Sequence, residues 1–189
     1  GFMPVLAQQS MRELTRTERK AENVLDCATF GAVQSGWREG FGSDADHLKT
    51  IEDIEAYRQA GFTMFTIDPG EHVNNDADTL AGAALADAFN SLPWSALESS
   101  AGDCASRHEN KSIKLDNGQS FDLSAEALRR AAVKYGKAIA HTVRLFRHLV
   151  EKAGSNGFEL EMSVDETASV TSPAEHYFVA SELKRLGVK

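Results

Sequence analysis

Short apolar runs and longer periodic segments alternate along the chain. Runs of strand length occupy 3–10, 41–48, 62–70 and 158–167, and each is followed by a segment whose apolar residues recur at helical spacing. A repeated strand-then-helix pattern predicts a parallel sheet covered by helices. Because four such units are half of an eight-stranded barrel, we expect an α/β fold: a partial, TIM-barrel-like (β/α)8 structure of about four βα units.

Capping residues mark where the expected helices begin and end. A side chain that accepts hydrogen bonds from the first turn, or a glycine that allows a left-handed conformation, is typical of these positions. The segment 11–40 predicts one or two helices. Further helices are expected to begin at Thr50, Ser124 and Ser172, and the first two of these to end at Gly61 and Gly154.

The pattern loosens in the middle of the chain. A helical pattern over 76–92 is followed by a helix end and loop over 93–111, and then by Asp-Asn-Gly at 116–118 between two alternating runs, which predicts a β-hairpin. We interpret residues 80–125 as a variable insertion of helix and hairpin within a single domain, 1–189. Since the pattern calls for another strand after the last helix, we expect the chain to be the N-terminal or central part of a larger barrel.

Charge and composition exclude several classes of partner. The formal net charge is -8, and without a basic block the surface would repel a phosphate backbone, so we expect no nucleic-acid partner. No run approaches the roughly 18 apolar residues of a membrane span, and the first residues lack the pattern of a secretory signal. We therefore expect a cytoplasmic protein with no membrane partner. Cys27 and Cys104 lack a zinc-site spacing, and we expect free thiols.

Acidic side chains lie where the predicted strands end. In the strand at 158–167, Phe158 and Leu160 begin an apolar face, and Glu161 and Asp165 lie on the other face. In a barrel the apolar face packs on the helices, so these acids are expected to face the interior near the C-terminal mouth. Asp68 ends the third strand in the same way. Polar groups that point into a core need partners, which favours a functional site at this end.

A histidine accompanies the acids at the end of the second strand. Asp44, Asp46 and His47 follow one another closely there. His47 with carboxylates from other strands, such as Glu161, is a plausible ligand set for a divalent metal ion, and zinc, manganese, nickel and iron all accept imidazole and carboxylate donors. We expect such a metal ion as the cofactor.

Structural roles are alternatives for several of these residues. An aspartate before Pro-Gly, as at Asp68, also caps turns, and Asp46 lies just ahead of a helix whose dipole it complements. Glu161 is a poor turn or cap residue. His141 on the long helix is typical of a packing histidine, and the charges over 129–148 of that helix are typical of a solvated face.

Five stretches of the chain resemble the tagaturonate epimerase family, also called tagaturonate/fructuronate epimerases. They are AQQSMRELTRT (7–17), GWREGFGSDADHLKT (36–50), GFTMFTIDPGEHVNN (61–75), AAVKYGKAIAH (131–141) and ELEMSVDETASVTSPAEHYFVASELKRLGVK (159–189). The resemblance implies a metal-dependent sugar-acid epimerase with a barrel-like fold that acts in hexuronate breakdown. Family members are longer, and their further strands and a histidine-containing motif are expected to complete the metal site. Asn74 is a departure, because the family more often has an acid there.

The resemblance also gives the candidate residues their expected roles. Tagaturonate and fructuronate differ at a hydroxyl-bearing carbon one bond beyond the position next to the ketone, so we expect retro-aldol cleavage and re-addition in place of simple proton abstraction. We expect that a bound metal ion would polarise the ketone and that a carboxylate moves the hydroxyl proton. We expect His47 and Glu161 to bind the metal, Asp68, Asp165 and Asp44 to act as catalytic acids or bases, and Lys49 and Glu166 to bind the substrate.

Two other functions fit the same residues. A different metal-dependent keto-sugar isomerase or aldolase would need much the same ligands and base. Alternatively, the chain is an inactive half-barrel that self-associates through open strand edges, as a homo-oligomer. The favoured partner is a small-molecule sugar acid.

Overall fold

The computed structural model of this chain describes residues 2–165 and 167–188. In this part of the chain the elements form two compact units, which we call the sheet unit (Gly1–Asp68 with Arg144–Ser163) and the helical unit (Pro69–Val143 with Val164–Lys189). The single domain over 1–189 and the variable insertion over 80–125 stay predictions.

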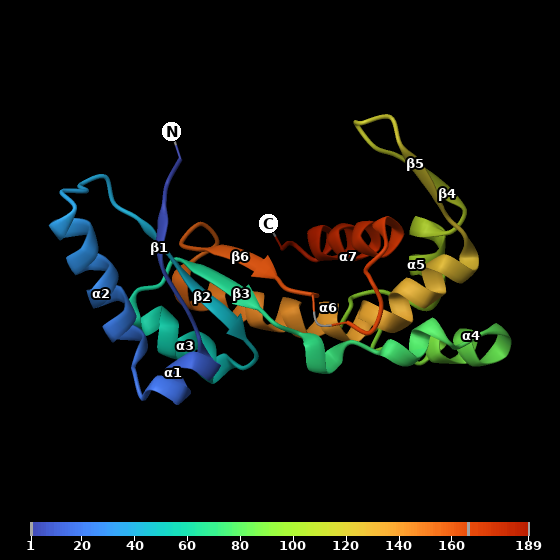
Figure 1. Cartoon of the computed structure of the whole chain (residues 1–189). Coiled ribbons are helices and arrows are strands. Elements are labelled where there is room, and N and C mark those ends of the chain that lie inside the picture. The colour runs from blue at the N-terminus through green and yellow to red at the C-terminus, as the bar shows by residue number, and fades with distance from the viewer. Residues whose placement is uncertain (1, 166, 189) are drawn as a thin grey trace. The chain divides into compact units, whose positions relative to one another are not determined.

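The sheet unit contains the predicted parallel sheet. Over the described residues its four strands are hydrogen-bonded in the order β1-β2-β3-β6, and every neighbouring pair is parallel (Figure 1). The strands are β1 (Val5–Ser10), β2 (Gly42–Leu48), β3 (Met64–Ile67) and β6 (Glu159–Met162). This confirms an α/β fold with a parallel sheet, whereas closure into a barrel stays a prediction.

Two helices of the sheet unit lie within the segment 11–40, which predicts one or two helices, and the third begins and ends where the sequence predicts. The helices of this unit are α1 (Met11–Thr17), α2 (Ala21–Gln34), α3 (Ile51–Ala60) and the last part of α6 (Ala125–Ala153). At the start of α3, Thr50 Oγ1 accepts a hydrogen bond from the Asp53 amide at 3.1 Å, and the Asp53 carboxylate accepts one from the Thr50 amide at 3.0 Å. Gly61 ends α3 with a φ of 100°, a conformation that glycine adopts without strain.

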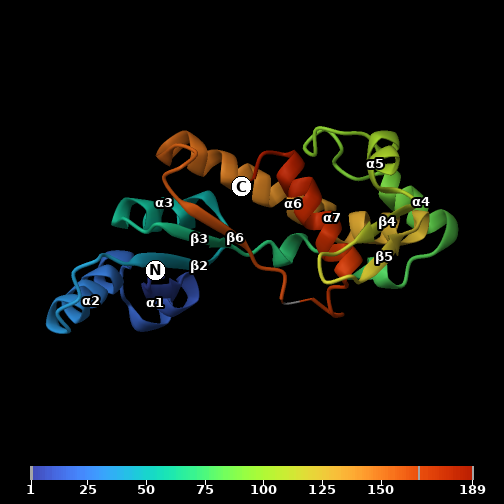
Figure 2. The same cartoon turned by 90° about the horizontal axis from the view of Figure 1, so that it is seen from above.

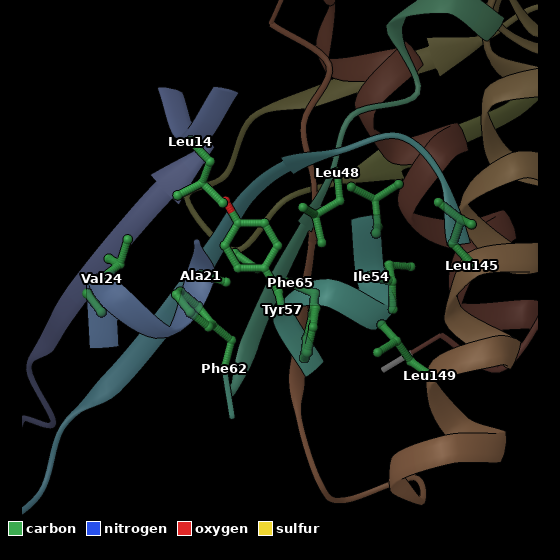
Figure 3. Close-up of a cluster of buried hydrophobic side chains, with 13 residues drawn as sticks. Leu14, Ala21, Val24, Leu48, Ile54, Tyr57, Phe62, Phe65, Leu145 and Leu149 are labelled. Carbon is green, nitrogen blue, oxygen red and sulfur yellow. The ribbon is translucent and has the colours of Figure 1, made fainter. Parts of the chain in front are cut away.

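One buried apolar cluster holds these helices on a single face of the sheet. Phe65 contributes to it from β3, Tyr57 from α3, and Leu145 and Leu149 from α6 (Figure 3). Ile67 of β3 also belongs to the cluster. Full burial of each such side chain stabilises the fold by roughly 1.5–3 kcal/mol. Because alternate strand residues point to opposite faces, the residues between the core positions of β3 lie on the face away from the helices.

The helical unit contains the predicted hairpin and one helix that the sequence interpretation missed. Its elements are α4 (Gly82–Asn90), α5 (Ala101–His108), β4 (Lys111–Lys114), β5 (Ser120–Leu123), the first part of α6, and α7 (Pro173–Arg185), with short 3₁₀ turns at Gly70–His72 and Asn75–Asp78 (Figure 2). β4 and β5 pair antiparallel, as predicted. The loop prediction is wrong for α5, whose first turn is capped by Ser100. The helix predicted over 76–92 begins only at Gly82.

A buried carboxylate joins α5 and α7 within the helical unit. Glu182 is 2% exposed, and its oxygens accept hydrogen bonds from Arg107 at 3.2 and 3.3 Å and from Arg185 at 2.8 and 3.0 Å, and lie 2.8 Å from Nε2 of His108. Burial by itself raises the pKa of Glu182, but the hydrogen bonds from His108, Arg185 and Arg107 outweigh it and lower the pKa to about 2. The charged form is therefore strongly favoured in the folded unit.

The cysteines and the apolar character of the helices bear on two further expectations. Cys27 is exposed and Cys104 is buried, and both are free thiols as expected. Among the described residues, none of the helices is both long enough and apolar enough to cross a membrane.

Candidate active site

A row of polar side chains crosses the sheet face that points away from the helices. It takes one residue from each strand: Gln8, Asp44, Thr66 and Glu161. Gln8 and Asp44 are register partners on β1 and β2, and Thr66 and Glu161 are register partners on β3 and β6. Hydrogen bonds link them: Gln8 Nε2 donates to Asp44 Oδ2 at 3.2 Å, and Thr66 Oγ1 lies 3.0 Å from Asp44 Oδ1 and 3.4 Å from Glu161 Oε2.

Asp44 is the most buried acid of this row, at 6% exposed. Burial raises the pKa of Asp44, the hydrogen bond from Thr66 partly offsets this, and the negative charges of Asp46 and Glu161 raise the pKa further. A carboxyl group whose proton affinity is increased in this way is typical of acid–base sites. The geometry therefore supports Asp44 as a proton-transfer group, the role that the resemblance implies.

The end of β2 contains a β-bulge at His47. Ala45 and Leu48 are both fully buried in the core although they are three positions apart, and the pairing of β2 with β3 shifts register between them. His47 has a φ of 56°, in the left-handed region that residues other than glycine rarely occupy. The extra residue keeps both Asp46 and His47 off the core face while returning Leu48 to it.

Asp46 and His47 contact each other through their side chains. The Asp46 Oδ1 and His47 Nδ1 atoms are 2.7 Å apart, and the side chains are 23% and 34% exposed, respectively. The alternative role of Asp46 as a dipole partner of α3 stays a prediction. This acid–imidazole pair lies at the carboxyl end of its strand, where ligands bind in open α/β sheets.

Lys49 and Asp68 also come together at this end of the sheet. The Lys49 Nζ atom lies 3.4 Å from Asp68 Oδ2, with side chains 44% and 10% exposed. The Asp68 amide donates to the carbonyl of Leu48 at 2.9 Å, which extends the β2–β3 pairing by one residue. An expected substrate-binding cation and an expected acid–base residue are thus neighbours.

The remaining predicted site residues are less enclosed or lie elsewhere. Glu161, expected in a barrel interior, is exposed, because within the described residues β6 is an edge strand that pairs with β3 alone. The predicted strand is longer than β6, which ends at Met162, so Asp165 follows it as an exposed residue of the helical unit. Glu166 lies outside the described residues.

The donors for a metal ion form a partial set in this chain. Over residues 2–165 and 167–188, no three or more histidine, cysteine, aspartate and glutamate side chains cluster closely enough to hold a metal ion. The two predicted ligands, His47 and Glu161, supply an imidazole and a carboxylate, which are donor types that divalent transition metals accept. The chain thus fits such an ion in donor chemistry, with fewer ligands than a complete site needs.

The sequence interpretation missed three polar residues that the structure places in networks. Gln8 follows the alternation of β1 onto the polar face, a signal that was available in LAQQS. Tyr57 is fully buried and donates a hydrogen bond to the carbonyl of Gln9 at 2.6 Å. In the helical unit Lys134 is fully buried and lies 3.2 Å from Asp78 and 2.6 Å from Ser169, so the expected solvated face of α6 is wrong at this position.

His141 also lies in the helical unit. It is buried, at 9% exposed, and its ring stacks on that of His72 with the centroids 4.1 Å apart. This packing agrees with the structural alternative for His141.

A parallel sheet with acids and an imidazole at the carboxyl ends of its strands defines the class of α/β proteins that bind small ligands at that edge. The family model for tagaturonate epimerase matches residues 1–189. The chain therefore belongs to the tagaturonate epimerase family, as the resemblance implied.

Individual relatives agree with this assignment. The tagaturonate/fructuronate epimerase of Thermotoga maritima is 40% identical over 189 residues, which are 100% of this chain and 37% of that protein. Crystal structures of the fructuronate-tagaturonate epimerase from Cohnella laeviribosi are 32% identical and cover 98% of this chain and 37% of theirs. The TM-score is 0.86 for a form with one glycerol bound and 0.83 for the native form. The chain thus spans 37% of the length of these relatives.

Proposed function

We propose that the protein represented by this chain interconverts tagaturonate and fructuronate, the activity named for its relatives. The observation that carries the proposal is the match of the family model over the whole chain. The polar row on the sheet face supports it, because a sugar acid offers hydroxyl groups and a carboxylate that such side chains bind. We further propose that the sheet is part of a (β/α)8 barrel.

The proposed reaction is a retro-aldol cleavage followed by re-addition. A carboxylate takes the proton from the hydroxyl group on the carbon to be inverted. The bond between that carbon and the carbon next to the ketone breaks, which leaves an aldehyde and an enediolate. After the aldehyde presents its other face, the same carbon–carbon bond forms again and the proton returns to the oxygen. No atom is gained or lost.

Residues of the sheet unit are suited to these steps. Asp44 combines burial with a raised pKa, so it both accepts and returns a proton readily, and Asp68 is the second candidate. Lys49, with its exposed ammonium group beside Asp68, is suited to bind the substrate carboxylate. Asp165 and Glu166 retain their predicted roles in acid–base chemistry and substrate binding.

His47 and Glu161 would hold a divalent metal ion. A bound ion of this kind supplies Lewis-acid polarisation of the ketone oxygen. The residues around it would then orient the substrate and move the proton. Zinc, manganese, nickel and iron all fit this donor chemistry.

The activity is tested by a matched pair of histidine variants. Tagaturonate and fructuronate are assayed side by side with neutral ketohexoses, in this chain and in a version extended to the length of the relatives. We expect His47→Ala to abolish turnover and His148→Ala to preserve it, because His148 contacts Glu55 on the helix side of the sheet unit. Loss of turnover on chelation and its return with added metal would test the cofactor. Equal activity in both variants would remove His47 from the site.

The reaction type is tested in deuterated water. Retro-aldol cleavage keeps the carbon-bound hydrogen of the inverted carbon throughout, so we expect no solvent deuterium at that carbon in the product. Incorporation of deuterium there would contradict the mechanism. Preference for neutral ketohexoses would support an isomerase or aldolase instead.

A further inference from the structure

The contact between Asp46 and His47 is unusual for consecutive residues of a strand. In a regular strand, side chains at adjacent positions point to opposite faces. Their heads then cannot form a hydrogen bond with each other. The 2.7 Å approach of Asp46 Oδ1 to His47 Nδ1 therefore depends on the bulge.

The bulge brings this contact about through a strained backbone conformation. His47 adopts its left-handed φ of 56°, which costs roughly 1–2 kcal/mol for a residue with a β-carbon. On either side, Ala45 and Leu48 remain fully buried in the core and hold the strand in place. The fold thus maintains the strain at one position, and the result is that an imidazole lies against the preceding carboxylate.

This contact determines which ring nitrogen carries the proton. A carboxylate has only acceptor oxygens, so the hydrogen bond requires the proton on His47 Nδ1. In a neutral imidazole the lone pair is then on Nε2. Metal-binding histidines commonly donate their other ring N–H to a carboxylate in this way, and this partner fixes the ring's orientation and increases its basicity.

Two other histidines of the chain contact a carboxylate through the opposite ring nitrogen. His148 contacts Glu55 through Nε2 at 2.7 Å, and His108 contacts Glu182 through Nε2 at 2.8 Å. Both histidines lie on helices and have ordinary backbone conformations. The Nδ1 contact at His47 is therefore associated with the bulge, and the Glu55–His148 pair provides a control of similar distance within the same unit.

We propose that Asp46 is a positioning residue, which fixes the His47 imidazole with its proton on Nδ1 and so makes Nε2 the atom that acts on the metal or substrate. The ligand role of His47 rests on the proposed function. The assignment of the proton to Nδ1 by Asp46 rests only on the geometry of β2. The two can therefore be tested separately.

The test compares Asp46→Asn with Glu55→Gln in the ¹⁵N-labelled chain. Ring nitrogen spectra are recorded at about pH 8, above the ordinary imidazole pKa, where the tautomer is visible. We expect the His47 proton on Nδ1 in the original chain and in Glu55→Gln. In Asp46→Asn, whose amide can donate to Nδ1, we expect it to move largely to Nε2. Asp46→Ala, which removes the partner altogether, should also lose the Nδ1 preference.

Manganese titration in the same spectra measures the ligand role. If His47 binds the ion, we expect its ring signals to broaden, and Asp46→Asn to weaken binding roughly 10- to 100-fold, as for other lost partners of metal-bound histidines. A proton on Nε2 in the original chain, or an unchanged tautomer in both Asp46 variants, would overturn the inference. If the tautomer changes as expected but manganese broadens no His47 signal in the original chain or in any variant, the inference stands and the metal assignment of the proposed function fails.

Discussion

Replacement of Glu182 by glutamine should strongly destabilise the helical unit. Glu182 is almost fully buried and carries the charge that Arg107 and Arg185 contact. The neutral amide has nearly the same shape, so it fills the same space. It leaves two guanidinium groups without their counter-charge, and removing one partner of a buried ion pair is among the costly substitutions in proteins.

The magnitude follows from the pKa of Glu182. Hydrogen bonds from His108, Arg185 and Arg107 hold this pKa at about 2, compared with an ordinary value of 4.5. Each pKa unit corresponds to about 1.4 kcal/mol, so the charged form of Glu182 stabilises the folded unit by about 3 kcal/mol at neutral pH. Glu182→Gln should lower the free energy of unfolding by about this amount.

The same pKa difference gives the pH dependence. As the pH falls below about 4.5, the carboxyl of the unfolded chain takes up a proton, whereas that of the folded unit does so only near pH 2. The stabilisation is therefore complete above about pH 4.5 and is lost progressively between about pH 4.5 and about pH 2. At about pH 3 the difference between the original chain and Glu182→Gln should fall to about 1 kcal/mol.

Tryptophan fluorescence can follow each unit separately. The sequence contains two tryptophans, Trp37 in the sheet unit and Trp94 in the helical unit. In a Trp37→Phe background, urea unfolding followed at Trp94 reports the helical unit. Glu126→Gln is the matched control, since Glu126 pairs with Arg130 at 2.7 Å but is 68% exposed, and should cost less than about 0.5 kcal/mol. Similar small losses for both variants, or a Glu182→Gln difference independent of pH, would refute the reasoning.

Two further substitutions test the sheet unit. Burial raises the pKa of Asp44, so its charge costs folding free energy at neutral pH; Asp44→Asn should stabilise the unit by roughly 0.5–2 kcal/mol while abolishing turnover. Urea unfolding followed at Trp37 in a Trp94→Phe background measures this, and a loss of stability would contradict it. Tyr57→Phe removes the phenol that donates to the carbonyl of Gln9 and should cost about 1–2 kcal/mol in the same assay; an unchanged midpoint would contradict this.

Much of the fold follows from local signals in the sequence. The start of α3 at Thr50 and its end at Gly61 are set by hydrogen bonds and backbone conformations that involve only neighbouring residues, so the residue types predict them. The hairpin follows in the same way from Asp-Asn-Gly, where Gly118 has a φ of 84°. α5 was missed because Gly102 and several short polar residues weaken its helical pattern, although Ser100 three residues before Asp103 is a capping signal.

The candidate site depends more on contacts between distant residues. Alternation in β3 and β6 is enough to place Thr66 and Glu161 on one face. The residue types of Asp44 and His47 are enough to make them candidate site residues. The hydrogen bonds of Asp44, however, join β1, β2 and β3, and a single sequence does not give strand order or register. Nor does the pattern GSDADHL reveal a bulge, because regular alternation would place His47 on the same face as Ala45. The bulge is set by the burial of Leu48, which is a property of the packed core.

The bulge also makes one part of the site separable from the fold. In terms of chain length, His47 is an inserted residue: if it were deleted, Ala45 and Leu48 would become two positions apart, the spacing at which a regular strand directs both to the same face. The sheet could then pair without interruption, and only the acid–imidazole contact would be lost. Insertion or deletion of a single residue at this point would therefore create or remove the acid–imidazole contact and would leave the core residues of the strand unchanged.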